Sequence, residues 1–249
     1  MIQDLHSHTY YSFCGKNKPQ EIVEAAIAGG VELFGICDHN YGIGIARKDL
    51  RKRPDIVDLD AYQVHLGRYF DHINLIKEKY ADRITILRGI EIATQNLKDY
   101  VPLPEGVDIS FFDYCLIEHI DEPSCSIAHG DLFGFADRCG TPAVGIAHTD
   151  LFAFIKAIGE DPFRYFCRMA EQNIFWEINV NFDSTHQYRE HAYVKRFFES
   201  DEQQAIVREA GVRLSVGFDG HRVEDYAPNR VSDACRKITD LGIKLAFES

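Results

Sequence analysis

Histidine and carboxylate residues occur in this sequence at a spacing that suits metal binding. His6 and His8 are separated by one residue near the start of the chain, and Asp219 and His221 repeat that spacing near its end. Residues two apart in an extended strand project to the same side, so both side chains of such a pair can reach one ion. Imidazole and carboxylate together suit Zn, Mn or Fe, whereas Ca and Mg sites are built mainly from oxygen. We therefore expect a site for Zn, Mn or Fe.

Four more candidate ligands each lie at or just after the end of a short apolar run: His39, Glu91, His119 and His148. Together with the two pairs they make eight candidate ligands, six of them histidine. This is more than a single ion can use, so the sequence predicts at least two divalent ions.

Apolar runs of strand length alternate along the chain with longer segments of helical spacing. The predicted strands are 2–5, 33–37, 84–92, 114–117, 143–147, 174–178 and 212–216. The predicted helices include 19–28, 59–80, 162–172, 201–210 and 227–241, and Gly29-Gly30, Gly140, Gly211 and Gly242 are placed to end helices. This alternation predicts a parallel sheet with helices outside it.

A distorted seven-stranded parallel (β/α) barrel of the TIM type is the fold that we expect. Parallel strands in a barrel point their carboxyl ends to one face, so the scattered candidate ligands would converge there. The alternative is a doubly wound open sheet, which normally has a Gly-rich phosphate loop after its first strand. Residues 6–8 read His-Ser-His at that position, which favours the barrel.

Length and composition indicate a single domain over residues 1–249 in the cytoplasm. The 249 residues are 45% apolar, and the net charge of −12 gives little basis for binding nucleic acid. No signal-peptide pattern or bilayer-length apolar segment is seen, so we expect no membrane partner. The seven cysteines are odd in number and include no CxxC pair, which is typical of a reducing compartment.

Other polar residues have ordinary interpretations. Five histidines outside the strand ends are interpreted as core or surface residues: His65, His72, His129, His186 and His191. Asp4 and Asp38 adjoin candidate ligands, and each is either a carboxylate that orients an imidazole or a strand-edge residue.

Four segments of the chain resemble the motifs of the PHP family, named for polymerase and histidinol phosphatase. They are residues 4–9 (DLHSHT), 37–39 (CDH), 145–148 (GIAH) and 217–221 (GFDGH), and residues 89–91 and 118–119 resemble the family's bridging Glu and intervening His. The resemblance implies a distorted seven-stranded barrel that typically holds three ions. It also implies their ligands: His6, His8, Glu91 and Asp219 for the first ion, Glu91, His119 and His148 for the second, and His39 and His221 for the third.

Cys14 is the clearest departure from the family pattern. Related proteins often place a histidine at this position as a further ligand of the third ion. A thiolate binds zinc well, so Cys14 is either a substitute ligand or a plain loop cysteine. Within the family, the long helical segment before Glu91 looks most like that of histidinol phosphatases.

The expected reaction is hydrolysis of a small-molecule phosphomonoester by metal-bound hydroxide, with histidinol phosphate as one candidate substrate. Arg222, beside His221, is the best placed cation for phosphate binding, and Arg47 and Arg88 are weaker candidates. Two other functions remain open. One is amidohydrolase or deaminase chemistry, and the other is a non-catalytic metal-binding barrel.

Overall fold

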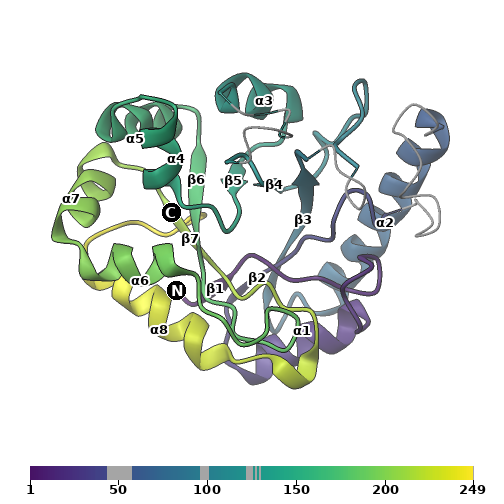
Figure 1. Cartoon of the computed structure of the whole chain (residues 1–249). Helices are drawn as coiled ribbons and strands as arrows, with labels where there is room; N and C mark the ends of the chain where they lie inside the picture. The colour runs from purple at the N-terminus through teal and green to yellow at the C-terminus, as the bar shows by residue number, and fades with distance from the viewer. Residues whose placement is uncertain (44–57, 96–100, 122–125, 127, 129, 249) are drawn as a thin grey trace.

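The computed structural model describes residues 1–43, 58–95, 101–121, 126, 128 and 130–248. Seven parallel strands of these residues lie side by side in chain order, with helices around them (Figure 1). The strands are β1 (Gln3–Asp4), β2 (Leu33–Ile36), β3 (Thr85–Ala93), β4 (Tyr114–Glu118), β5 (Val144–Ile146), β6 (Ile174–Asn179) and β7 (Leu214–Gly217). The prediction of a seven-stranded TIM-like barrel is confirmed.

The first and last strands nearly close the ring. The backbone N of Leu5 donates to the carbonyl of Val216 at 2.8 Å, and that of His8 donates to the carbonyl of Gly220 at 2.9 Å. Ser7 and Gly220 also form a parallel bridge. This pairing brings the His-x-His segment beside the Asp-x-His segment, although the two lie at opposite ends of the sequence.

Eight α-helices occur among the described residues, and most cover the outside of the barrel. They are α1 (Pro19–Ala28), α2 (Leu59–Lys79), α3 (Leu132–Cys139), α4 (Leu151–Ala157), α5 (Pro162–Glu171), α6 (Ala192–Glu199), α7 (Asp201–Ala210) and α8 (Pro228–Asp240). The five predicted helices are present. The helices α4 and α6 were not predicted, and of α3 only the glycine that ends it, Gly140, was predicted. Each of these helices has about two turns, which is too short to show a clear apolar periodicity.

Apolar side chains fill both faces of the sheet. On the outer face, Phe34 and Ile86 belong to a large cluster packed under the helices. On the inner face, Leu5, Tyr114 and Phe175 form a smaller cluster, and the Tyr114 hydroxyl donates to the carbonyl of Leu5 at 2.6 Å. Burial on both faces is typical of parallel strands. The barrel interior is therefore packed, and the polar candidate ligands collect at one end of it.

No helix of the described residues has the length and apolar character needed to cross a membrane. Arg47 and His129 lie outside the described residues.

Candidate metal centre

The predicted ligands come together at the carboxyl ends of the strands. They are His6 and His8 after β1, His39 after β2, Glu91 in β3, His119 after β4, His148 after β5, and Asp219 and His221 after β7. His119, His148 and Asp219 have φ angles of 61°, 25° and 55°. Residues other than glycine rarely adopt positive φ and need their surroundings to hold them there. The backbone therefore turns sharply at three of the strand ends.

Four of these residues form a tight group. The Nε2 atoms of His6 and His8 lie 3.2 Å apart. The Nε2 atom of His6 lies 3.2 Å from Glu91 Oε1, and that of His8 lies 3.1 Å from Asp219 Oδ1. Ligands about 2.1 Å from a tetrahedral ion are about 3.4 Å from one another. The four donors therefore have the spacing of ligands that share one ion.

Glu91 also faces a second group of donors. Its Oε2 atom lies 2.7 Å from His39 Nδ1, and its Oε1 atom lies 3.3 Å from His148 Nε2. Glu118 Oε1 lies 3.4 Å from the same nitrogen of His39. The Glu91 carboxylate is thus placed between two groups of imidazoles, as a bridging ligand would be.

His119 lies at the edge of this second group. Its Nε2 atom is 3.0 Å from Glu118 Oε2, and its ring centroid is 5.6 Å from that of His148. Glu118 itself was not predicted as a ligand. The signal was present, because a carboxylate at the end of an otherwise apolar strand is expensive to bury without a partner.

Cys14 lies among the histidines expected for the third ion. One potential ligand atom from each of Cys14, His8 and His39 lies within 4.8 Å of the others. Burial raises the pKa of the Cys14 thiol, but the imidazoles of His8, His221 and His39 outweigh this effect and lower the pKa to about 5. The thiolate is the form that binds metal. Of the two readings of Cys14, these surroundings favour the ligand.

Hydrogen bonds determine which nitrogen of His8 faces the centre. The Ser12 hydroxyl donates its one proton to Asp38 Oδ1 at 2.6 Å and accepts a bond from the backbone N of His39 at 2.9 Å. It can therefore only accept from His8 Nδ1, which is 3.2 Å away. With the proton on Nδ1, Nε2 is available to a metal. Asp38 thus orients His8 through Ser12.

Glu177 has the corresponding role for His6, and sequence reasoning missed it. Its Oε1 atom lies 2.7 Å from His6 Nδ1, and its Oε2 atom accepts a bond from the backbone N of His148 at 2.7 Å. A carboxylate behind an imidazole directs the opposite nitrogen toward a metal. Glu177 is buried in β6 between Trp176 and Ile178, so its polarity within an apolar strand was the available signal.

Asp4 accepts hydrogen bonds from two backbone N–H groups and one hydroxyl, and from no imidazole of the described residues. It accepts bonds from the backbone N of Phe218 at 2.9 Å and from the Tyr226 hydroxyl at 2.8 Å, and its bond from His6 comes from the backbone. Burial raises the pKa of Asp4 to about 6. Of its two interpretations, the structure supports the strand-edge residue, which here ties β1 to the segment after β7.

Several buried polar atoms at the centre have no hydrogen-bond partner among the described residues: His39 Nδ1, Glu91 Oε2, Glu118 Oε1 and Asp183 Oδ2. Although His39 Nδ1 and Glu91 Oε2 are only 2.7 Å apart, their geometry is not that of a hydrogen bond. A buried polar atom without a partner costs about 1–3 kcal/mol. Divalent cations would satisfy these atoms, so the donor set fits a metal centre.

The buried carboxylates control the charge of the centre. Burial lowers the pKa of His148 and of His221, but Glu91 and Asp219 outweigh it and raise these pKa values to about 9 and about 10. Burial opposes ionisation of Glu91 and Asp219, yet the neighbouring imidazoles hold both pKa values well below their usual range. The centre therefore attracts positive charge, as protons or as metal ions.

His186 and His191, interpreted from the sequence as ordinary core or surface histidines, lie beside the centre, a position that the sequence did not predict. His186 Nε2 is 3.3 Å from Asp219 Oδ2, and the His191 ring stacks on that of His148 with centroids 6.1 Å apart. Both follow β6 in the segment before α6, whose path the apolar pattern does not reveal. His65 and His72 lie in α2, where His72 is bonded to the Tyr11 hydroxyl.

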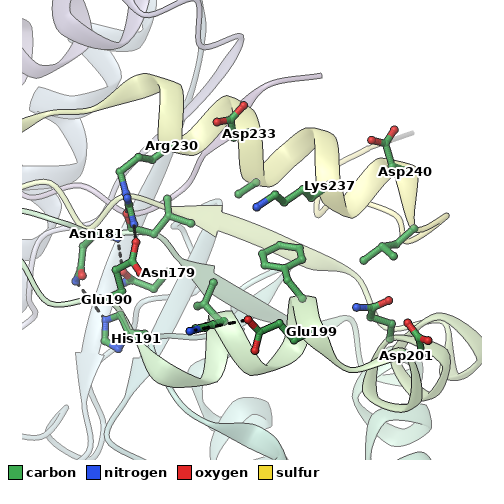
Figure 2. Close-up of a pocket in the computed structure, with 17 residues that line it drawn as sticks. Asn179, Asn181, Glu190, His191, Glu199, Asp201, Arg230, Asp233, Lys237 and Asp240 are labelled. Carbon is green, nitrogen blue, oxygen red and sulfur yellow. Dashed lines mark hydrogen bonds and ion pairs between the residues drawn. The ribbon is translucent and has the colours of Figure 1, made fainter.

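A pocket of about 660 Å³ borders the centre and runs between α6 and α8. Figure 2 shows Asn181 and His191 at one end of it and Asp201 and Asp240 at the other. Asn181 Nδ2 lies 3.2 Å from His191 Nε2 and 3.4 Å from Asp219 Oδ2. None of the candidate ligands lines the pocket, and Asn181 lies between its near end and Asp219.

Two of the three predicted phosphate-binding arginines, Arg222 and Arg88, belong to the described residues. Arg222 is exposed and lines a small crevice with Ile22 of α1, so its role in phosphate binding stays a prediction. The prediction that Arg88 binds phosphate is wrong, because its guanidinium is hydrogen-bonded to both oxygens of Asp113 and to Asn74.

Comparison with known proteins supports this picture. The model of the PHP domain family matches residues 4–241. No protein with a curated description matches the chain. Histidinol phosphate phosphatase from Lactococcus lactis, solved with zinc, L-histidinol and phosphate, is 17% identical with a TM-score of 0.58, over 98% of this chain and 95% of that one.

Two further structures are more distant. A proposed histidinol phosphatase from Listeria monocytogenes is 16% identical with a TM-score of 0.39, over 98% of this chain and 93% of that one. A chain of archaeal ribonuclease P is 12% identical with a TM-score of 0.42, over 95% of this chain and 90% of that one. The Lactococcus protein shares the fold. Because the family model covers nearly the whole sequence, the chain belongs to the PHP domain family.

Proposed function

We propose that this protein hydrolyses a small-molecule phosphomonoester at the metal centre. The observation that carries the proposal is the buried carboxylate of Glu91, both of whose oxygens lie between two imidazoles. Oε1 lies 3.2 Å from His6 Nε2 and 3.3 Å from His148 Nε2, and Oε2 lies 3.4 Å from His8 Nε2 and 2.7 Å from His39 Nδ1. A bridging carboxylate holds two ions close together, and phosphatases use such pairs of ions. Membership of the PHP family supports the same class of reaction.

The residues of the chain would hold three ions: His6, His8, Glu91 and Asp219 for the first, Glu91, His119 and His148 for the second, and Cys14, His39 and His221 for the third. When bound, such ions would bind phosphate oxygens and lower the pKa of water from about 15.7 toward about 7. Glu177 and Ser12 would keep His6 and His8 in the tautomers that bind metal. No side chain is required as a nucleophile.

We further propose a substrate with a cationic group on its alcohol side, of which L-histidinol phosphate is an example. The pocket beside Asn181 carries the carboxylates of Asp201 and Asp240 at its far end (Figure 2), and the alcohol portion of the ester would extend toward it. Those carboxylates would attract an ammonium or imidazolium group. Three expectations from the sequence stay predictions: the protein binds no nucleic acid, the chain is one domain, and it is cytoplasmic.

The test combines elemental analysis with phosphate release from L-histidinol phosphate, a sugar phosphate and a nucleotide, before and after chelation. We expect two or three ions per chain, chelator-sensitive release, and a preference for L-histidinol phosphate. Glu91→Gln should lower kcat/KM by at least about 100-fold, because it weakens both groups of ligands. His65→Gln, in α2, is the matched control and should behave as the wild type.

Two outcomes would contradict the proposal. Metal-loaded protein that releases no phosphate from any ester would point to amide hydrolysis or to a non-catalytic barrel. Phosphate release that persists after complete removal of metal would exclude the metal-dependent reaction.

A further inference from the structure

Asp183 and His186 form a second cluster of potential ligands beside the predicted ones. Asp183 is buried, and the His186 side chain is 28% exposed. One potential ligand atom from each of Asp183, His186 and His221 lies within 4.8 Å of the others. Neither Asp183 nor His186 belongs to the ligand sets that the PHP motifs imply.

Asp183 fixes the orientation of the His186 ring. Its Oδ1 atom accepts a bond from the backbone N of His186 at 2.8 Å and lies 2.7 Å from His186 Nδ1. With a proton on Nδ1, His186 directs Nε2 toward Asp219 Oδ2, which is 3.3 Å away. Carboxylates orient metal-binding histidines in this way.

The other oxygen of Asp183 has no hydrogen-bond partner among the described residues. This Oδ2 atom is buried and lies 3.7 Å from His221 Nδ1. That nitrogen cannot satisfy it, because it donates to the carbonyl of Asp219 at 2.8 Å. A buried, unsatisfied carboxylate oxygen next to two imidazoles is a position that a cation would stabilise.

Asp219 connects this cluster with the first group of ligands. Its Oδ1 atom lies 3.1 Å from His8 Nε2, while its Oδ2 atom lies 3.3 Å from His186 Nε2. The two oxygens of Asp219 therefore face two different imidazoles, as those of Glu91 do. One carboxylate can thus contribute to two neighbouring ions.

We propose that His186 Nε2 and Asp219 Oδ2 form an additional position for a divalent cation at the edge of the metal centre, next to His221, and that Asp183 orients His186 for it. Imidazole and carboxylate donors fit Zn or Mn. The inference rests on the metal centre of the proposed function, but it does not depend on the substrate. His221, which belongs to the set expected for the third ion, lies beside this position, with its ring centroid 5.1 Å from that of His186.

Zinc binding to the full chain tests this position. Metal-free wild type, His186→Gln, Asp183→Asn and the control His65→Gln are titrated with Zn²⁺ in competition with a chromophoric chelator. We expect His186→Gln and Asp183→Asn to weaken one ion by about 10–100-fold or to lose it, while the tightest ion stays unchanged. His65→Gln should match the wild type. Unchanged affinity for every ion in the folded His186→Gln variant would overturn the proposal.

A measurement on the wild type avoids the risk that Asp183→Asn disturbs folding. The ring nitrogens of His186 are followed by ¹⁵N NMR during addition of Zn²⁺, with His65 as the internal reference. A large shift of Nε2 but not of the His65 nitrogens is expected. A His186 spectrum that does not change at saturating Zn²⁺ would overturn the proposal.

Phosphate release separates this inference from the proposed function. Weakened zinc binding in His186→Gln, in a protein that cleaves no phosphate ester, would support the cation position and reject the phosphatase. Metal-dependent phosphate release together with wild-type zinc binding in His186→Gln would reject the cation position alone.

Discussion

Glu177 connects two candidate ligands through the two oxygens of one carboxylate. One oxygen contacts the ring of His6, and the other accepts a bond from the backbone N of His148. His148 has a φ of 25°, which is unfavourable for a residue with a side chain. The same carboxylate therefore sets the tautomer of one ligand and holds the strained backbone of another.

Replacement of Glu177 by Gln should weaken metal binding without removing a ligand. The amide has one oxygen and one NH₂ group, so it can accept at only one of the two positions. We expect Zn²⁺ affinity of the tightest ion to fall by about 10–100-fold, measured by chelator competition. Glu171→Gln, at the exposed end of α5, is the matched control. Wild-type affinity in Glu177→Gln would show that Glu177 does not position His6.

Single residues also show where prediction from the sequence ends. His39 and His148 were found because each closely follows an apolar run, and barrel geometry then places both at one end. Glu118 and Glu177 were overlooked because one carboxylate hardly changes the apolar pattern of a strand. The position of His186 was not predicted because the path of the segment after β6 is set by tertiary contacts, such as the one between His186 and Asp219, which leave no periodicity.

At the scale of elements, an ion pair between β3 and the segment before β4 supports the strand that carries Glu91. Arg88 donates from Nε to Asp113 Oδ2 at 3.0 Å and from Nη2 to Oδ1 at 2.6 Å. Its Nη1 atom donates to Asn74 of α2 at 2.9 Å. Arg88 thus joins β3, the segment before β4 and α2, which explains why it is not available to a substrate.

Loss of this ion pair should have a pH-dependent effect on stability. Burial raises the pKa of Asp113, but hydrogen bonds from Arg88 and the charge of Lys77 outweigh it and lower the pKa below its usual value. A lowered folded-state pKa means that the carboxylate stabilises the fold above the pKa of the unfolded chain. This contribution is lost as the pH falls through the folded-state pKa.

We therefore expect Asp113→Asn to lower the free energy of unfolding by about 1–2 kcal/mol at pH 7 and by less at about pH 3. Urea denaturation at the two pH values measures the difference. Asp137→Asn, exposed on α3, is the control and should cost little at either pH. An equal loss for Asp113→Asn at both pH values would contradict the assignment of the effect to charge.

At this scale the strands were easier to predict than the helices. Most strands are buried on both faces and appear as largely apolar runs, as in 114–117, and parallel order followed from the alternation with helices. The short helix α4 lacked such a pattern. Its remaining signal was Asp150, which accepts a bond from the backbone N of Ala153 and caps the helix.

For the whole molecule, the candidate centre depends on closure of the barrel. His8 is bonded through its backbone to Gly220, which brings it beside Asp219 although more than 200 residues separate the two. No local segment of the chain contains a complete set of ligands. Ion binding and folding should therefore be linked, because the unfolded chain cannot offer the same site.

Removal of metal should consequently lower the melting temperature. An ion present at 100 times its dissociation constant contributes about 2.7 kcal/mol, and in a chain of this size that corresponds to about 5–10 °C for each ion. Scanning calorimetry before and after chelation, and after return of Zn²⁺, measures the shift. Glu91→Gln is the comparison and should respond much less to the chelator, since it weakens both ligand groups. If wild type that has lost its measured ions melts at the same temperature as before, those ions were bound outside the barrel centre.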